Sequence, residues 1–146
     1  KFKFELGRAI VSGSVDRLEV SSDGQYFVVD FKTGKAIGKK EAAENLQLAC
    51  YQLAVVLDKF TDHPLTHSGE QPEVLGSHLV FLGHTAKDVT TRERPPIAVD
   101  EISTQIESIA TEMAAPTFIA KKNKFCGTCP VKSSCPLHIE GRSVIG

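Results

Sequence analysis

Apolar and polar residues between Phe4 and Lys32 form short runs, rich in β-branched and aromatic residues, that are typical of strands. Gly7, Gly13 and the sequence Ser21-Ser-Asp-Gly24 interrupt these runs and predict turns. This part of the chain is therefore predicted to form a β-meander.

Helical periodicity follows between Glu41 and Lys59, where apolar residues recur at three- and four-residue steps and predict the longest helix. Proline and glycine residues over 63–73 predict a loop, and Ser77-His-Leu-Val-Phe-Leu82 predicts a buried strand. A second helix is predicted to start near Asp100, as its N-cap, and to end before Pro116. Its apolar stripe consists of Ile102, Ile106, Ile109, Ala110 and Met113.

These elements predict an α/β domain with a mixed sheet flanked by two principal helices, and 146 residues, 41% of them hydrophobic, suit one core. No apolar run approaches the length of about 18 residues that a membrane span requires. A P-loop is also absent from the sequence, which excludes a self-contained nucleotide-driven motor. Because Met113 is the only methionine and no leader pattern precedes it, we expect a piece of a longer, cytoplasmic protein.

The net charge of −1 does not indicate a nucleic-acid partner, but it averages over two basic segments. Lys32–Lys40 and Thr117–Lys132 each contain four lysines and no carboxylate. Near-neutrality therefore does not exclude DNA.

Candidate chemistry lies in the strand Tyr26–Lys32, where alternation of side chains puts Asp30 and Lys32 on one face. If Ser22-Asp23-Gly24 forms a three-residue hairpin loop, the numbers of paired residues add up to about 46. Asp16 then lies opposite Asp30, and the two carboxylates repel each other. A divalent cation such as Mg²⁺ or Mn²⁺ relieves that repulsion.

Lys32 would lie about 6 to 7 Å further along the same face, within reach of a metal-bound water or a phosphate. Such a site predicts metal-assisted hydrolysis of a phosphodiester. The alternative is a surface strand whose Lys32 only neutralises an aspartate in a weak ion pair. Gln47 and Tyr51, four residues apart, share one face of the following helix.

In order along the chain, Gly13-Ser-Val-Asp16-Arg17, Val29-Asp30-Phe-Lys32-Thr-Gly-Lys35 and Gln47-Leu-Ala-Cys-Tyr51 resemble the motifs of RecB-family nuclease domains. These domains belong to the PD-(D/E)-x-K superfamily. The resemblance implies the restriction-endonuclease-like fold, with Asp16, Asp30 and the Phe31 carbonyl as metal ligands and Lys32 as the catalytic lysine. It also implies that Gln47 and Tyr51 position DNA; the alternative is a polar helix flank with Tyr51 packed.

Two departures from the family pattern affect this interpretation. Val15 stands where the superfamily name has proline, a common variation that does not argue against activity. Family members usually carry a further His or Glu ligand on a helix upstream of the first strand. The chain begins too late to include that helix, so we expect it to be inactive without its upstream segment.

Cys126, Cys129 and Cys135 fall within ten residues, which is metal-type spacing, but a tetrahedral or cubane site needs a fourth ligand. The tail resembles those of AddAB, AdnAB and CRISPR-associated nucleases, which implies a [4Fe–4S] cluster completed by an upstream cysteine. Cys50 lies in the helix stripe and is interpreted as an ordinary buried cysteine. The alternative is zinc, with His138 as the fourth ligand.

The remaining histidines, His63, His67, His78 and His84, are not interpreted as ligands, and His78 and His84 are expected as solvated ends of the strand. Lys87 and Arg92-Glu-Arg94 are interpreted as a solvated loop, and the alternative is contact with DNA phosphates.

The resemblance predicts a nuclease core over 1–116, a cysteine-rich tail over 117–146 and a DNA exonuclease of a bacterial UvrD/RecB-like helicase-nuclease. Its partners would be single-stranded DNA ends, the helicase motor domains and a second subunit, in the repair of double-strand breaks. No membrane partner is expected, and the protein is expected in the bacterial cytoplasm with the nucleoid. The alternatives are a catalytically silent scaffold with a nuclease fold and a zinc-bound docking module.

Overall fold

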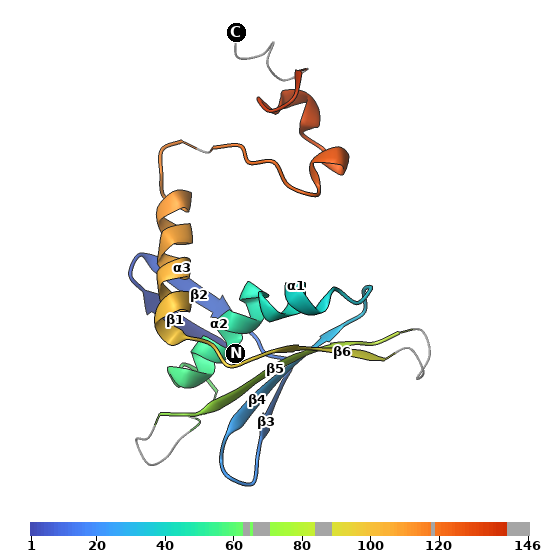
Figure 1. Cartoon of the computed structure of the whole chain (residues 1–146). Helices are drawn as coiled ribbons and strands as arrows, with labels where there is room; N and C mark the ends of the chain where they lie inside the picture. Colours follow the sequence, from blue (N-terminus) through green and yellow to red (C-terminus); the bar gives the residue numbers. More distant parts are fainter. Residues whose placement is uncertain (63–64, 66–70, 84–88, 118, 140–146) are drawn as a thin grey trace. The chain divides into compact units, whose positions relative to one another are not determined.

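The computed structural model describes residues 1–62, 65, 71–83, 89–117 and 119–139. The chain divides into two compact units, Lys1–Ala110 and Thr111–Gly146. The strands are β1 (Phe2–Leu6), β2 (Ala9–Gly13), β3 (Arg17–Val20), β4 (Tyr26–Lys32), β5 (Val74–Phe81) and β6 (Thr90–Arg94) (Figure 1). The helices are α1 (Lys39–Ala43), α2 (Leu46–Val56), α3 (Val99–Met113) and the 3₁₀ turns η2 (Cys126–Thr128) and η3 (Lys132–Ser134).

The central sheet is mixed, as expected, with the strand order β3-β4-β5-β6. Its middle pair, β4 and β5, is parallel and is connected through α1 and α2, while both outer pairs are antiparallel. Strands β1 and β2 form a separate two-stranded sheet, so the prediction of one continuous meander is wrong. Residues 14–16 belong to no strand, which lets the chain pass from one sheet to the other.

The register of the β3–β4 hairpin is confirmed. Arg17 pairs with Val29 and Val20 pairs with Tyr26, so paired numbers add up to 46. Gly24 has φ +79° in the turn, a left-handed conformation that favours glycine. Local turn chemistry therefore fixes which residues of β4 face Asp16.

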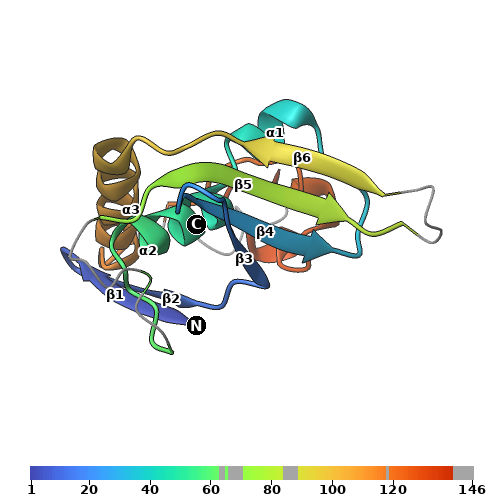
Figure 2. The ribbon, with the colours of Figure 1, turned by 90° about the horizontal axis from the view of Figure 1, so that it is seen from below.

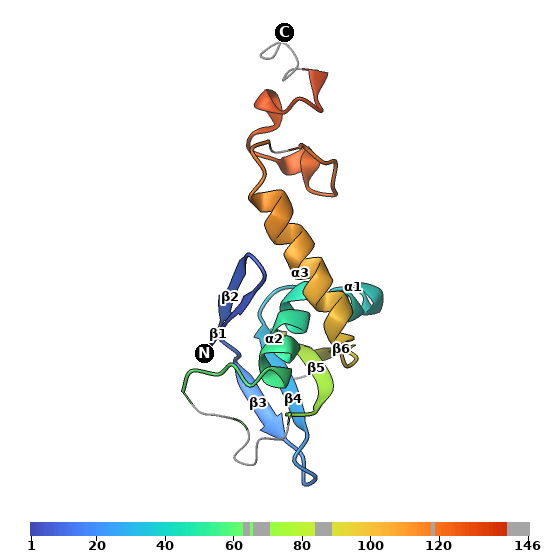
Figure 3. The same ribbon diagram turned by 90° about the vertical axis from the view of Figure 1, so that its left-hand side faces the viewer.

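The helix predicted over residues 41–59 is divided into α1 and α2. Asn45 separates them and caps α2, because its side-chain oxygen accepts the Leu48 N–H at 3.0 Å. Helix α2 is apolar on nearly all sides, which suits its position between the central sheet and the β1–β2 hairpin (Figure 3). Phe2 from β1 packs edge-on against Tyr51 of α2, with ring centroids 5.7 Å apart.

Seen from below, the strands of the central sheet lie in front of α1 and α2, so both helices belong to one side of it (Figure 2). In the described part of the chain, no helix combines the length and the apolar character needed to cross a membrane.

Strand β6 corrects the prediction of a solvated loop at Arg92-Glu-Arg94. Its alternating polar residues carry no hydrophobic signal, but its backbone pairs antiparallel with β5, Ser77 opposite Arg94. Main-chain hydrogen bonding at a sheet edge does not require apolar side chains. Lys87 and most of the predicted loop over 63–73 lie outside the described residues.

The predicted second helix, α3, begins at Val99, so Asp100 occupies its first turn and is not its N-cap. Ile102 and Ile106 are buried as predicted, whereas Ile109 and Met113 are exposed. The predicted strand at Ser77 is β5, which begins earlier, at Val74. These differences leave the α/β class and the positions of the candidate site residues unchanged.

Candidate active site

The carboxyl end of β4 presents a buried acid and a lysine on one face. Asp30 is only 3% exposed, and its Oδ2 lies 2.8 Å from Nζ of Lys32. The lysine side chain itself is about one-third exposed, so the pair reaches from the core to the surface. Alternation along β4 brings Val28, Asp30 and Lys32 to the same face.

Asp16 lies one residue before β3 and is held against the same end of β4. Its Oδ2 accepts the Phe31 N–H at 2.9 Å. The Lys32 carbonyl accepts the Leu82 N–H at 2.8 Å, on the β5 side of β4. Because backbone groups alternate in direction along a strand, the Phe31 carbonyl faces the opposite side, where Asp16 lies.

Helix α2 completes the cluster with Gln47 and Tyr51. Lys32 Nζ donates to Gln47 Oε1, and Gln47 Nε2 donates to Tyr51 Oη, both at 2.9 Å. The spacing of four residues puts these two side chains one turn apart on the helix. An unbroken chain of contacts therefore runs from Asp30 through Lys32 and Gln47 to Tyr51.

The charges of both carboxylates affect the pKa of the Tyr51 hydroxyl. Burial raises its pKa, and the negative charges of Asp30 and Asp16 raise it further. The hydrogen bond from Gln47 and the positive charge of Lys32 lower the pKa in part. The hydroxyl is therefore protonated at neutral pH, and since its oxygen accepts from Gln47, its hydrogen is available to an anionic oxygen.

The oxygen donors at this end of β4 fit a hard divalent cation. Asp30 Oδ2 is fully buried, and its contact with Lys32 lacks hydrogen-bond geometry, so it accepts no hydrogen bond in the structure. The Lys32 ammonium offsets the charge of this oxygen in part, but because the oxygen accepts no hydrogen bond its lone pairs are free to bind a metal cation. Asp16 and the Phe31 carbonyl add two further oxygens, and Mg²⁺ often takes only one or two carboxylates and keeps several waters.

Over the described ranges, no three side chains of His, Cys, Asp or Glu gather closely enough to hold a metal ion. Cys126, Cys129 and Cys135 are free thiols, and His138 does not complete a site with them. Backbone turns link them, with the Cys126 sulfur accepting the Asn123 N–H at 3.2 Å and the Cys129 carbonyl accepting the Lys132 N–H. The described tail is thus a series of tight turns carrying three thiols.

Cys50 packs against the core from α2, as expected, and is half-buried. Burial raises the pKa of its thiol, and the charge of Arg94 lowers the pKa in part. Cys50 is therefore a neutral thiol at neutral pH.

His78 lies within β5, and its expected position at a solvated strand end is wrong. It contacts Glu93 at 3.1 Å and the Phe27 ring, with ring centroids 4.2 Å apart. His63, His67 and His84 lie outside the described residues.

Two polar residues of structural importance escaped prediction. Gln52 is completely buried and links α2 to β5, and Arg94 donates to the Ala43 carbonyl at the end of α1. The glutamine within the apolar run Leu-Ala-Cys-Tyr-Gln-Leu-Ala is the signal that would have identified the first.

A family model described as the PD-(D/E)XK nuclease superfamily matches residues 1–136 of the chain. A search of curated proteins returned no match.

Proposed function

The chain belongs to the PD-(D/E)XK nuclease superfamily, and we propose that it hydrolyses phosphodiester bonds of DNA with Mg²⁺ or Mn²⁺ as the cofactor. The observation that carries this proposal is the buried Asp30 oxygen, which has no hydrogen bond and lies beside Lys32. A structural ion pair on a surface strand would not need a carboxylate so far from solvent.

Asp30, Asp16 and the Phe31 carbonyl would hold the cation. When bound, such an ion polarises the phosphate and lowers the pKa of a coordinated water. The Phe31 N–H keeps the Asp16 carboxylate oriented along β4, and Asp30 keeps the ammonium of Lys32 at the carboxyl end of the strand.

Lys32 is the proposed catalytic lysine. One of its three N–H donors is used by Gln47, and the ammonium lies beside Asp30 as an ion pair, which leaves donors for a water or a phosphate oxygen. A positive charge at that point stabilises the negative charge that develops during hydrolysis. Gln47 fixes the lysine, and the protonated Tyr51 hydroxyl is positioned to donate to the DNA backbone.

In a protein that also includes the segment upstream of Lys1, substitution Lys32→Gln is expected to lower the rate of metal-dependent DNA cleavage about 10²- to 10³-fold, the usual loss for one donor that stabilises transition-state charge. Mn²⁺ affinity, measured by isothermal titration calorimetry, should change little, because the oxygen ligands remain. Lys59→Gln, an exposed lysine after α2, is the matched control and should cleave like wild type.

Equal cleavage by Lys32→Gln and wild type would remove Lys32 from the mechanism. No metal-dependent cleavage by a protein that also includes the segment upstream of Lys1 would instead favour a catalytically silent scaffold.

We further propose that this reaction belongs to an exonuclease domain of a bacterial helicase-nuclease that processes DNA double-strand breaks in the cytoplasm. Single strands would be supplied by helicase motor domains, with a partner subunit in the complex. The ordered motifs at Asp16, Asp30–Lys32 and Gln47–Tyr51, together with the cysteine tail, support this assignment by their resemblance to RecB-family nucleases.

The tail is proposed to bind a [4Fe–4S] cluster through Cys126, Cys129 and Cys135. This proposal is supported by the donor chemistry of the tail, which carries three thiols on one short segment. It is not supported by the geometry, since the sulfurs of the described residues do not form a metal site. A protein that also includes the upstream cysteine, purified without oxygen, is expected to contain about four iron and four sulfide per chain and to absorb visible light. Cys129→Ser should lose both, with Cys50→Ser as control; stoichiometric zinc without iron would contradict the cluster.

A further inference from the structure

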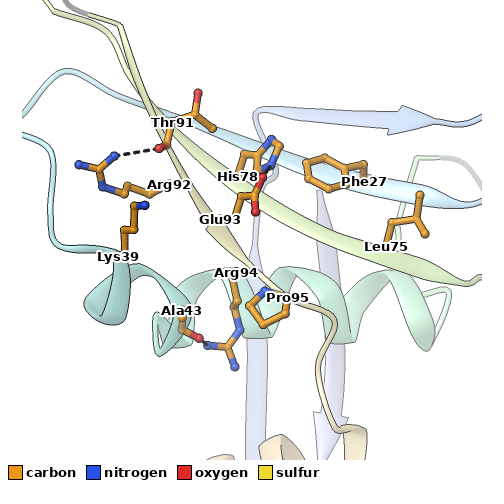
Figure 4. Close-up of a pocket in the computed structure, with 10 residues that line it drawn as sticks. All are labelled: Phe27, Lys39, Ala43, Leu75, His78, Thr91, Arg92, Glu93, Arg94 and Pro95. Carbon is orange, nitrogen blue, oxygen red and sulfur yellow. Dashed lines mark hydrogen bonds and ion pairs between the residues drawn. The ribbon is translucent and has the colours of Figure 1, made fainter.

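A groove of about 670 Å³ runs along β6, which is the edge strand of the central sheet opposite β3. Lys39 and Ala43 of α1 line it together with Thr91–Pro95 of β6 and its continuation. Phe27, Leu75 and His78 of β4 and β5 complete the lining. In Figure 4, Lys39 extends from α1 toward the side where Arg92 lies, whereas Phe27 and His78 lie further along the strands.

The groove carries an excess of positive charge. Its lining includes the cations Lys39, Arg92 and Arg94 and one carboxylate, Glu93, which contacts His78. Arg92 Nε donates to the Ile37 carbonyl at 2.9 Å, and Arg94 donates to the Ala43 carbonyl. These contacts fix both guanidinium groups without neutralising them, since neither pairs with a carboxylate of a described residue.

The lining also offers apolar and aromatic surface around the edge strand β6, on the other face of the sheet from Arg92 and Arg94. Phe27 lies edge-on to His78 with 65° between their planes, and Leu75 and Pro95 flank them. Grooves that combine cations with aromatic rings suit single-stranded nucleic acids, because the phosphates meet the cations and the bases stack on the rings.

A second, smaller hollow of about 330 Å³ lies at the Thr90 end of β6. It is lined by Thr33–Ala36, which directly follow Lys32, and by Thr90, which precedes Thr91 of the groove. Neighbours in the chain thus line the two hollows, but no lining residue is shared between them or with the candidate active site.

We propose that the groove along β6 is a second contact site for single-stranded DNA, which holds the strand some distance from the position of cleavage. This inference rests on the proposed nuclease function. Lys39 is its exposed phosphate contact and Phe27 its stacking surface, while Arg92 and Arg94 add fixed positive charge.

The test measures binding separately from cleavage. Fluorescence anisotropy of a labelled single-stranded oligonucleotide, with EDTA present, gives Kd for wild type and variants of the whole chain. Lys39→Gln is expected to raise Kd about five- to tenfold and to reduce the slope of log Kd against log salt by about 0.7. Phe27→Leu, which keeps an apolar side chain and so preserves folding, should raise Kd about tenfold through loss of stacking.

Lys40→Gln is the matched control, because it removes a lysine from the next position of α1, where Lys40 faces Glu44 at 3.9 Å and does not line the groove. It should change Kd less than about twofold, as expected for an exposed charge outside the contact site. Equal effects at Lys39 and Lys40, wild-type Kd for Phe27→Leu, or no binding by wild type would each overturn the inference. Asp30→Asn should bind like wild type, so a loss of cleavage with intact binding affects the proposed function alone.

Discussion

Replacement of Asp30 by asparagine is expected to lower the rate of Mg²⁺- or Mn²⁺-dependent DNA cleavage about a thousandfold, because metal stabilisation of the transition state contributes several kcal/mol. Asparagine has the same shape but no charge, so both the proposed cation and the Lys32 ammonium lose their buried partner. The measurement is the initial rate of cleavage of a labelled single strand at saturating metal.

A binding measurement separates this loss from misfolding. Mn²⁺ should raise the Tm of the wild-type protein and leave that of Asp30→Asn unchanged, since only the folded wild-type site binds the ion. Asp23→Asn is the matched control: Asp23 is an exposed aspartate in the turn before β4, and its loss should alter neither cleavage nor the metal response. If Asp30→Asn cleaves at the wild-type rate, Asp30 is not a metal ligand.

Substitution Gln52→Leu is expected to lower the free energy of unfolding by about 3 kcal/mol, because buried polar partners left without hydrogen bonds cost about 1 to 3 kcal/mol each. Gln52 Nε2 donates to Ser77 Oγ at 2.8 Å and to the Pro95 carbonyl at 3.2 Å. Its Oε1 accepts the Ile97 N–H at 3.0 Å. One side chain thus joins α2 to β5 and to the segment between β6 and α3.

Urea unfolding followed by circular dichroism measures this change. Gln105→Leu, which replaces an exposed glutamine of α3, is the matched control. Its free energy of unfolding should stay within about 0.5 kcal/mol of wild type, as is usual for surface substitutions away from buried networks. Equal unfolding free energies for Gln52→Leu and wild type would show that the network contributes nothing net.

The parts of the site that depend on local geometry were predictable from the sequence. Gly24 fixes a turn whose length sets the register, so Arg17 opposite Val29 followed from the chain alone. The two-residue period of β4 put Asp30 and Lys32 on one face, and the four-residue spacing put Gln47 next to Tyr51. These are consequences of backbone periods and do not require knowledge of the rest of the fold.

The parts that depend on contacts between distant segments were not predictable. Strand β6 carries no hydrophobic pattern and exists because β5 offers it a backbone to pair with. Gln52 resembles any other polar residue in a helix until Ser77 and Pro95 surround it. The carboxylate of Asp16 likewise acquires its partner, the Phe31 amide, only when the hairpin closes.

The sequence by itself thus determined the α/β class, the order of the candidate catalytic residues and their faces, because repeating backbone geometry governs neighbours along one strand or helix. Only the tertiary structure decided that Lys32 meets Gln47, that Asp30 is buried without a hydrogen bond, and that α1 and β6 enclose a cationic groove. Those features arise from side chains far apart in the chain, whose proximity depends on packing and burial and not on any local period.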